Sequence, residues 1–77
     1  MRLSEVAINT QVIIKKIKCN EELKKRFYSF GIVQGAELFI EATSMKKNTI
    51  EINIEDTHIA LRYDEAQTIE VEIMNEM

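Results

Sequence analysis

The chain has no tryptophan and no proline, and its 77 residues include one cysteine and two glycines. Such a composition excludes collagen-like, polyproline and flexible-linker structures. Cys19 alone cannot close a disulfide within the chain, and small secreted domains usually depend on such bridges, so we expect a cytoplasmic location. The longest apolar runs are three residues, too short to cross a bilayer, and the first residues lack the apolar block of a signal peptide.

The residues that are present predict a small globular domain rich in sheet. Hydrophobic residues make up 45% of the chain and charged residues 30%, and 21 residues are Ile, Val or Thr, which favour strands. We therefore expect a single domain of residues 1–77, with a free energy of unfolding of roughly 4–11 kcal/mol. The pI of about 5.1 opposes binding to a nucleic-acid backbone.

Charge is unevenly distributed along the chain. Residues 1–50 carry nine Lys or Arg and five Asp or Glu, whereas residues 51–77 carry one Arg and eight acidic residues. One interpretation is a solvated surface whose strands differ in sign. The other is a basic patch that steers the protein toward an acidic partner or an anionic membrane surface.

The first half predicts a strand, a helix and a tight turn. Apolar residues in 11–18 indicate a strand, and Asn20 is a typical N-cap for the helix that follows. Leu23, Phe27 and Phe30 recur on one helix face and are expected in the core. Gly31 is expected to end the helix in a Schellman motif, and Gly35 to supply a positive φ in the turn over residues 33–36.

The second half alternates apolar and polar residues with a period of two, which is typical of half-buried antiparallel strands. Turns are expected at 44–48 and 55–56, and one helical turn at 63–67, before the last strand. Five short strands in so small a chain favour a partly closed barrel, which removes exposed edges. The predicted core is Val12, Ile14, Leu23, Phe27, Leu38, Ile40, Ile52, Ile54, Ile59, Leu61, Ile69 and Val71.

The sequence contains no catalytic or metal-binding motif. Cys19 and His58 are the only soft ligands, they do not have zinc-site spacing, and His58 is expected on an outward strand face. Glycine-rich phosphate loops and hydrolase motifs are absent, so we expect neither an enzyme nor a tight metal site. An alternative function stays open: a protein that binds Fe(II) or another divalent cation weakly through surface carboxylates and His58, and that senses or delivers it.

Two segments resemble the FeoA (ferrous-iron transport protein A) family. The helix ends in Phe30-Gly31 with a second glycine four residues later, and residues 60–71 match the pattern A-L-R-x-x-E-A-x-x-I-x-V at every named position. The resemblance covers nearly the whole chain. It implies a mainly β, SH3-like barrel of five strands, with one α-helix inserted after the first long strand.

The resemblance also implies a function. FeoA-like proteins are cytoplasmic accessory proteins of ferrous-iron uptake, and the implied partner is FeoB, a membrane permease with a GTPase domain. The chain would then act at the membrane without inserting into it; whether it forms a homo-oligomer stays open. The chain departs from the family pattern in the 44–48 loop, which has neither Pro nor Gly, at Gln34, where proline is common, and at Asp56, where glycine is usual.

Exposed basic residues with a few apolar neighbours are the candidate docking surface, because charge steers an encounter and apolar side chains hold it. Phe39 and Tyr28 are either local packing residues or partner anchors. The hypothesis comprises Lys24, Lys25, Tyr28, Phe39, Met45, Lys46 and Lys47.

Overall fold

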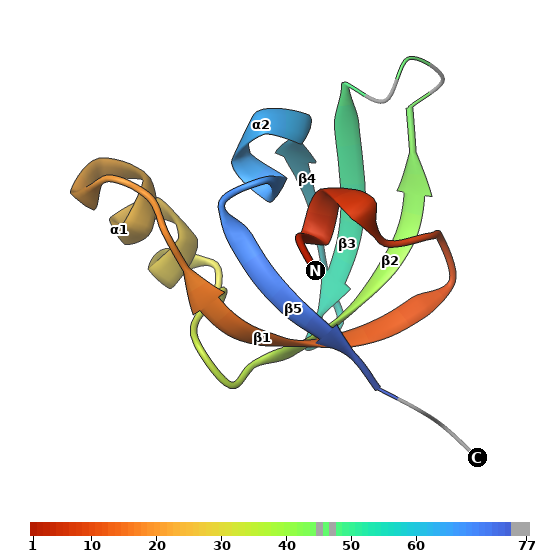
Figure 1. Ribbon diagram of the computed structural model, residues 1–77, viewed down its shortest axis with the longest axis horizontal. Coiled ribbons are helices and arrows are strands. Elements are labelled where there is room, and N and C mark those ends of the chain that lie inside the picture. Colours follow the sequence, from red (N-terminus) through yellow and green to blue (C-terminus); the bar gives the residue numbers. More distant parts are fainter. Residues whose placement is uncertain (45, 47, 75–77) are drawn as a thin grey trace.

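The computed structural model describes residues 1–44, 46 and 48–74. It contains one five-stranded antiparallel sheet in the order β4-β3-β2-β1-β5, which curls around the core (Figure 1). Sheet and helices follow the predicted sequence of elements. Their bounds are η1 (Leu3–Glu5, a 3₁₀ helix), β1 (Thr10–Ile17), α1 (Glu21–Ser29), β2 (Glu37–Thr43), β3 (Thr49–Ile54), β4 (Thr57–Arg62), α2 (Tyr63–Ala66) and β5 (Ile69–Ile73).

Helix α1 begins and ends as predicted. The Asn20 side chain accepts the backbone N–H of Leu23 at 2.8 Å, which satisfies a free donor of the first turn. At the other end, Gly31 has φ 85°, and the N–H groups of Gly31 and Ile32 reach the carbonyls of Tyr28 and Phe27 at 3.0 and 2.9 Å. This is the predicted Schellman motif, and it folds Ile32 into the core beside the helix.

The β3–β4 hairpin is closed by a two-residue turn without glycine. Glu55 and Asp56 have φ of 50° and 65°, and the backbone N–H of Asp56 is held by the Asn53 side chain at 3.1 Å. Two positive φ angles define the turn type whose twist matches the flanking strands. The Asp56 side chain therefore does not prevent the turn that a family glycine usually makes.

The core confirms eleven of the twelve predicted residues and corrects one. Leu23 is only half-buried and packs against the rim of the core. Phe30, which the helix periodicity predicts to be buried, is 39% exposed because the helix ends there and the chain turns away at Gly31. The core also contains buried residues that the predicted set omits: Leu3, Val6, Ile32, Ile50 and Ala66.

Candidate partner-binding surface

Helix α1 stands at one end of the molecule, where the buried Phe27 and an ion pair of Arg26 hold it against the rest of the chain. Phe27 is fully buried. Arg26 Nη1 lies 2.6 Å from Glu65 Oε2 in α2, and Glu65 Oε1 accepts the backbone N–H of Arg62 at 3.0 Å. Burial alone would raise the pKa of Glu65, but the bonds from Arg26 and Arg62 outweigh it and hold that pKa below its usual value. Glu65 therefore ties α2 to α1.

A groove of about 300 Å³ lies between α1, the C-terminal half of β1 and the loop that follows the helix. Its walls combine apolar side chains with two lysines, Lys16 from β1 and Lys24 from α1. Neither lysine has a carboxylate within 4.0 Å among the described residues. The full lining is Lys16, Ile17, Lys24, Tyr28, Ile32, Val33 and Gln34.

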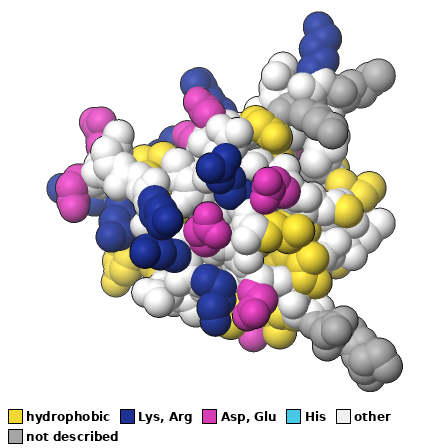
Figure 2. Space-filling view, in the orientation of Figure 1, with side chains coloured by type: hydrophobic (Ala, Val, Ile, Leu, Met, Phe, Trp, Pro, Cys, Tyr) yellow, Lys and Arg dark blue, Asp and Glu magenta, His cyan; other side chains and the backbone are white. Residues whose placement is uncertain are grey.

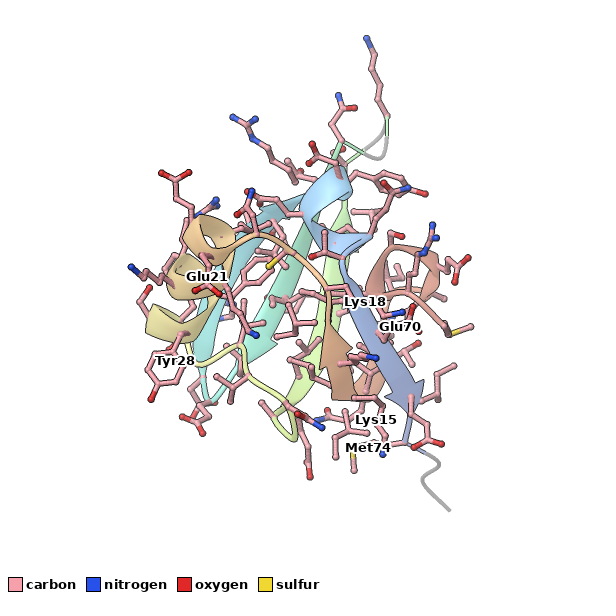
Figure 3. All side chains as sticks on the ribbon, turned by 60° about the vertical axis from the view of Figure 1, so that its left-hand side comes forward. Lys15, Lys18, Glu21, Tyr28, Glu70 and Met74 are labelled. Carbon is pink, nitrogen blue, oxygen red and sulfur yellow. The ribbon has the colours of Figure 1, made fainter. Side chains whose placement is uncertain are left out.

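The structure brings two of the predicted docking residues together at this groove. Lys24 and Tyr28 are one helical turn apart, and Tyr28 is 74% exposed, extending from α1 away from the sheet (Figure 3). Lys25 is exposed on the same helix but does not line the groove. On the face drawn in Figure 2, Lys and Arg side chains are interspersed with Asp and Glu over the half that holds α1, and hydrophobic side chains are concentrated on the other half.

The other predicted docking residues lie elsewhere. Lys46 is exposed in the loop between β2 and β3, which projects from the opposite end of the molecule from α1 (Figure 1). Lys46 therefore does not lie beside the helix residues of the hypothesis, and Met45 and Lys47 lie outside the described residues; that these residues bind a partner stays a prediction. Phe39 is half-buried in β2, where it pairs with Gln11 and Asn53 on the neighbouring strands.

Sequence reasoning missed Lys16 and the loop residues Val33 and Gln34 as parts of the surface. Lys16 lies in the predicted strand behind an apolar run, and residues 33–36 are predicted only as a turn. A signal was present in the Schellman motif, because it directs the chain after Gly31 back along the helix toward β1. The Schellman motif does not predict how wide a groove remains between the helix and β1.

A second polar cluster crosses the outer face of β2, β3 and β4. The Nδ1–H of His58 donates to Glu41 Oε1 at 2.7 Å, and the Asn53 side chain donates to Glu41 Oε2 at 3.3 Å. The hydrogen bond and charge of Glu41 raise the pKa of His58, with smaller help from Asp56 and Glu51. The same hydrogen bond lowers the pKa of Glu41.

The pH dependence of this cluster follows from both directions. Because the pKa of His58 is raised, the protonated ring stabilises the fold fully at pH values below its usual pKa near 6.5. This stabilisation is lost as the pH rises through the pKa of the folded state. A lowered pKa of Glu41 stabilises the fold above its usual value and is lost as pH falls through the lowered one. The His58–Glu41 pair therefore contributes most to folding stability at pH values between the pKa of Glu41 and the pKa of His58.

We expect Glu41→Gln to return the pKa of His58 toward 6.5, because the substitution removes the charge that favours the imidazolium. An NMR titration of the His58 ring protons in both proteins measures this shift. Glu37→Gln, on the same strand, is the control and should leave the titration unchanged. Equal His58 titrations in the parent and Glu41→Gln would contradict the ion pair.

The described residues contain no group of three or more His, Cys, Asp or Glu arranged to hold a metal ion. Cys19 is half-buried against the core. That the chain has no tight metal site of its own stays a prediction. None of the described helices has the length and apolar character needed to span a membrane.

Comparison with known proteins identifies the family. The FeoA domain model matches residues 1–73. This chain belongs to the FeoA family. It is 44% identical over 68 residues to the Fe(2+) transport protein A of Helicobacter pylori strain J99, with 87% of each chain covered. The predicted resemblance to the FeoA family is thereby confirmed.

FeoA structures share the fold over nearly the whole chain. The solution structure of FeoA from Chlorobium tepidum has a TM-score of 0.92 and 25% identity, covering 97% of this chain and 71% of that one. FeoA from Stenotrophomonas maltophilia, solved with zinc and described as a prokaryotic SH3 domain protein, has a TM-score of 0.81 and 25% identity, covering 94% and 89%. The SH3-like fold is therefore confirmed.

One relative joins two proteins in a single chain. The Fe(2+) transport protein A/Fe(2+) transporter FeoB fusion protein of Porphyromonas gingivalis is 28% identical over 75 residues. The match covers 97% of this chain and 9% of the fusion protein. In that organism a FeoA-like domain is therefore covalently attached to the transporter.

Proposed function

We propose that this protein regulates ferrous-iron uptake by docking on the cytoplasmic part of an FeoB-type permease. The observation that carries the proposal is the Porphyromonas gingivalis fusion, because covalent linkage holds two domains at a high effective concentration and suits domains that work together. The protein acts by binding rather than catalysis, and it stays peripheral to the membrane.

The surface over α1 supports this role. Lys24 and Lys25 are exposed lysines without carboxylate partners among the described residues, and Tyr28 beside them is an exposed aromatic. Exposed charge accelerates association with an oppositely charged partner, and aromatic side chains supply much of the binding energy at interfaces. The cytoplasmic membrane surface is negative, so the same lysines orient the protein toward a partner embedded there.

We expect the double variant Lys24→Glu, Lys25→Glu to weaken binding to the permease's cytoplasmic domain by at least about tenfold at low salt. The salt dependence of the remaining binding should also fall, because fewer charges contribute. Surface-immobilised cytoplasmic domain, with each variant titrated at low and high salt, measures both. Circular dichroism checks that the fold is intact.

The control is Lys46→Glu, which lies between β2 and β3 and makes the same charge change as the single variant Lys24→Glu, with which it is compared. Its affinity should stay close to that of the parent. If the parent protein does not bind the cytoplasmic domain at all, the proposed function is wrong. If Lys46→Glu weakens binding and the α1 variant does not, the docking face is the β2–β3 loop instead.

A further inference from the structure

The two halves of β1 are paired differently. Its first half pairs with β2 from Thr10↔Ile40 to Ile13↔Glu37. Ile14 then bonds to the loop after the helix, with its N–H on the Ala36 carbonyl and its carbonyl on the Gly35 N–H, both at 2.8 Å. Beyond Ile14 the register shifts, and the second half of β1 pairs only with β5.

Ile17 consequently has an unpaired backbone edge. The Lys18 N–H bonds to the Thr68 carbonyl at 2.8 Å, which makes Ile17↔Ile69 the non-hydrogen-bonded kind of antiparallel pair. The N–H and carbonyl of Ile17 therefore point away from β5. No other backbone group in residues 1–44, 46 and 48–74 bonds to them.

This edge lies at the α1 groove. Ile17 and Lys16 form its β1 wall, and the loop that bonds to Ile14 continues the same side of the strand. The opposite wall is helix α1, with Lys24 and Tyr28. An open strand edge facing a helix, with an apolar groove between them, has the geometry in which an extended peptide adds as a further strand.

The charge of the groove indicates which kind of peptide it binds. The groove presents Lys16 and Lys24, neither with a carboxylate partner among the described residues, around the apolar Ile17, Ile32 and Val33. In an added strand, alternate side chains face opposite ways, so one apolar residue can enter the groove while its acidic neighbours face the lysines. A neutral or basic segment would leave both lysines uncompensated.

We propose that this groove binds an extended, acidic segment of a protein partner, which adds to β1 at Ile17 and inserts one apolar side chain. The inference rests on the proposed function, because the segment then belongs to the cytoplasmic part of the permease. It goes further by naming the mode of recognition, strand addition, and the chemistry of the segment.

The proposal is tested by the rate of hydrogen exchange at the backbone amide of Ile17. In the free protein the Ile17 amide should exchange hydrogen faster than the amides of Lys16 and Lys18, because Lys16 pairs with Glu70 and the Lys18 N–H bonds to the Thr68 carbonyl, whereas the Ile17 N–H points away from β5. Saturation of ¹⁵N-labelled protein with the permease's cytoplasmic domain should slow Ile17 exchange by about tenfold or more, since a new backbone hydrogen bond protects it. Overlapping dodecapeptides from that domain should locate a segment that produces the same protection and contains acidic residues beside an apolar one.

Two charge variants, one at the end of β1 and one directly after it, separate binding in the groove from general electrostatic attraction. Lys16→Glu places a carboxylate in the groove, and we expect it to weaken binding by at least about tenfold. Lys18→Glu makes the same change outside the groove and should retain most of the parent affinity. Tyr28→Ala, at a side chain exposed enough to be removed without harming the core, should weaken binding as well.

Several results would overturn the inference while leaving the proposed function in place. One is tight binding of the cytoplasmic domain without slower Ile17 exchange, and another is equal affinity of Lys16→Glu and Lys18→Glu. A third is the absence of any dodecapeptide that protects Ile17. Sedimentation of the free protein tests a competing occupant: a dimer in which Ile17 is already protected would assign the groove to a second copy of this chain. A parent protein that does not bind the domain would instead end the proposed function.

Discussion

Replacing Phe27 by alanine is expected to lower the free energy of unfolding by about 3–5 kcal/mol. Phe27 is fully buried and is the side chain that anchors α1 in the core. A chain of this size has roughly 4–11 kcal/mol in total, so the variant should be largely unfolded or close to it at room temperature. Urea denaturation followed by circular dichroism measures the difference.

Phe30→Ala is the matched control for Phe27→Ala. It removes the same type of side chain three residues further on, at the C-cap of α1, where Phe30 is 39% exposed. Its cost should stay below about 1 kcal/mol, the range of partly exposed positions without special contacts. If both variants lost the same free energy of unfolding, Phe30 would be buried like Phe27, as the helix periodicity predicts, and the observed end of the helix would be wrong.

Leu3→Ala should also cost about 2–5 kcal/mol. Leu3 is fully buried although it lies in a three-residue 3₁₀ helix near the start of the chain. That segment is fixed to β5, because the Val71 N–H bonds to the Met1 carbonyl at 2.8 Å and the backbone of Arg2 forms an isolated antiparallel β-bridge with Glu70. Thermal denaturation of the variant should show a large fall in the midpoint.

Ile8→Ala gives the comparison for Leu3→Ala. Ile8 lies a few residues away and is 49% exposed, so its truncation should cost about 0.5 kcal/mol or less. If Leu3→Ala were as stable as Ile8→Ala, the first residues would not be part of the core, and the pairing of Met1 and Arg2 with β5 would have to be abandoned.

Local features of the sequence were enough to predict the elements and most of the core. Alternation with a period of two gives the strands their inward faces without knowledge of their partners, because side chains of a strand point to opposite sides. Asn20 and Gly31 mark the helix ends through hydrogen bonds to groups a few residues away. Such signals involve only neighbours along the chain, so they can be read before the fold is known.

The errors in the core lie where burial depends on distant elements. Phe30 follows the helix stripe, but the turn at Gly31 carries the chain off before that position can pack. Leu3 stands in a segment without clear periodicity, and it is buried because β5 and α2 lie over it. The burial of Leu3 is not visible in the local pattern, since the residues that cover it are tens of positions away.

The same distinction applies to the surface. The spacing of Lys24 and Tyr28 by four residues places them on one helix face, which the sequence alone determined. Only the tertiary structure decided that Lys16 faces Lys24 across a groove, that Lys46 lies at the far end, and that Ile17 keeps an open backbone edge. These relations depend on where β2 stops pairing with β1 and where the register shifts against β5. They are set by the packing of whole elements, which no single stretch of sequence contains.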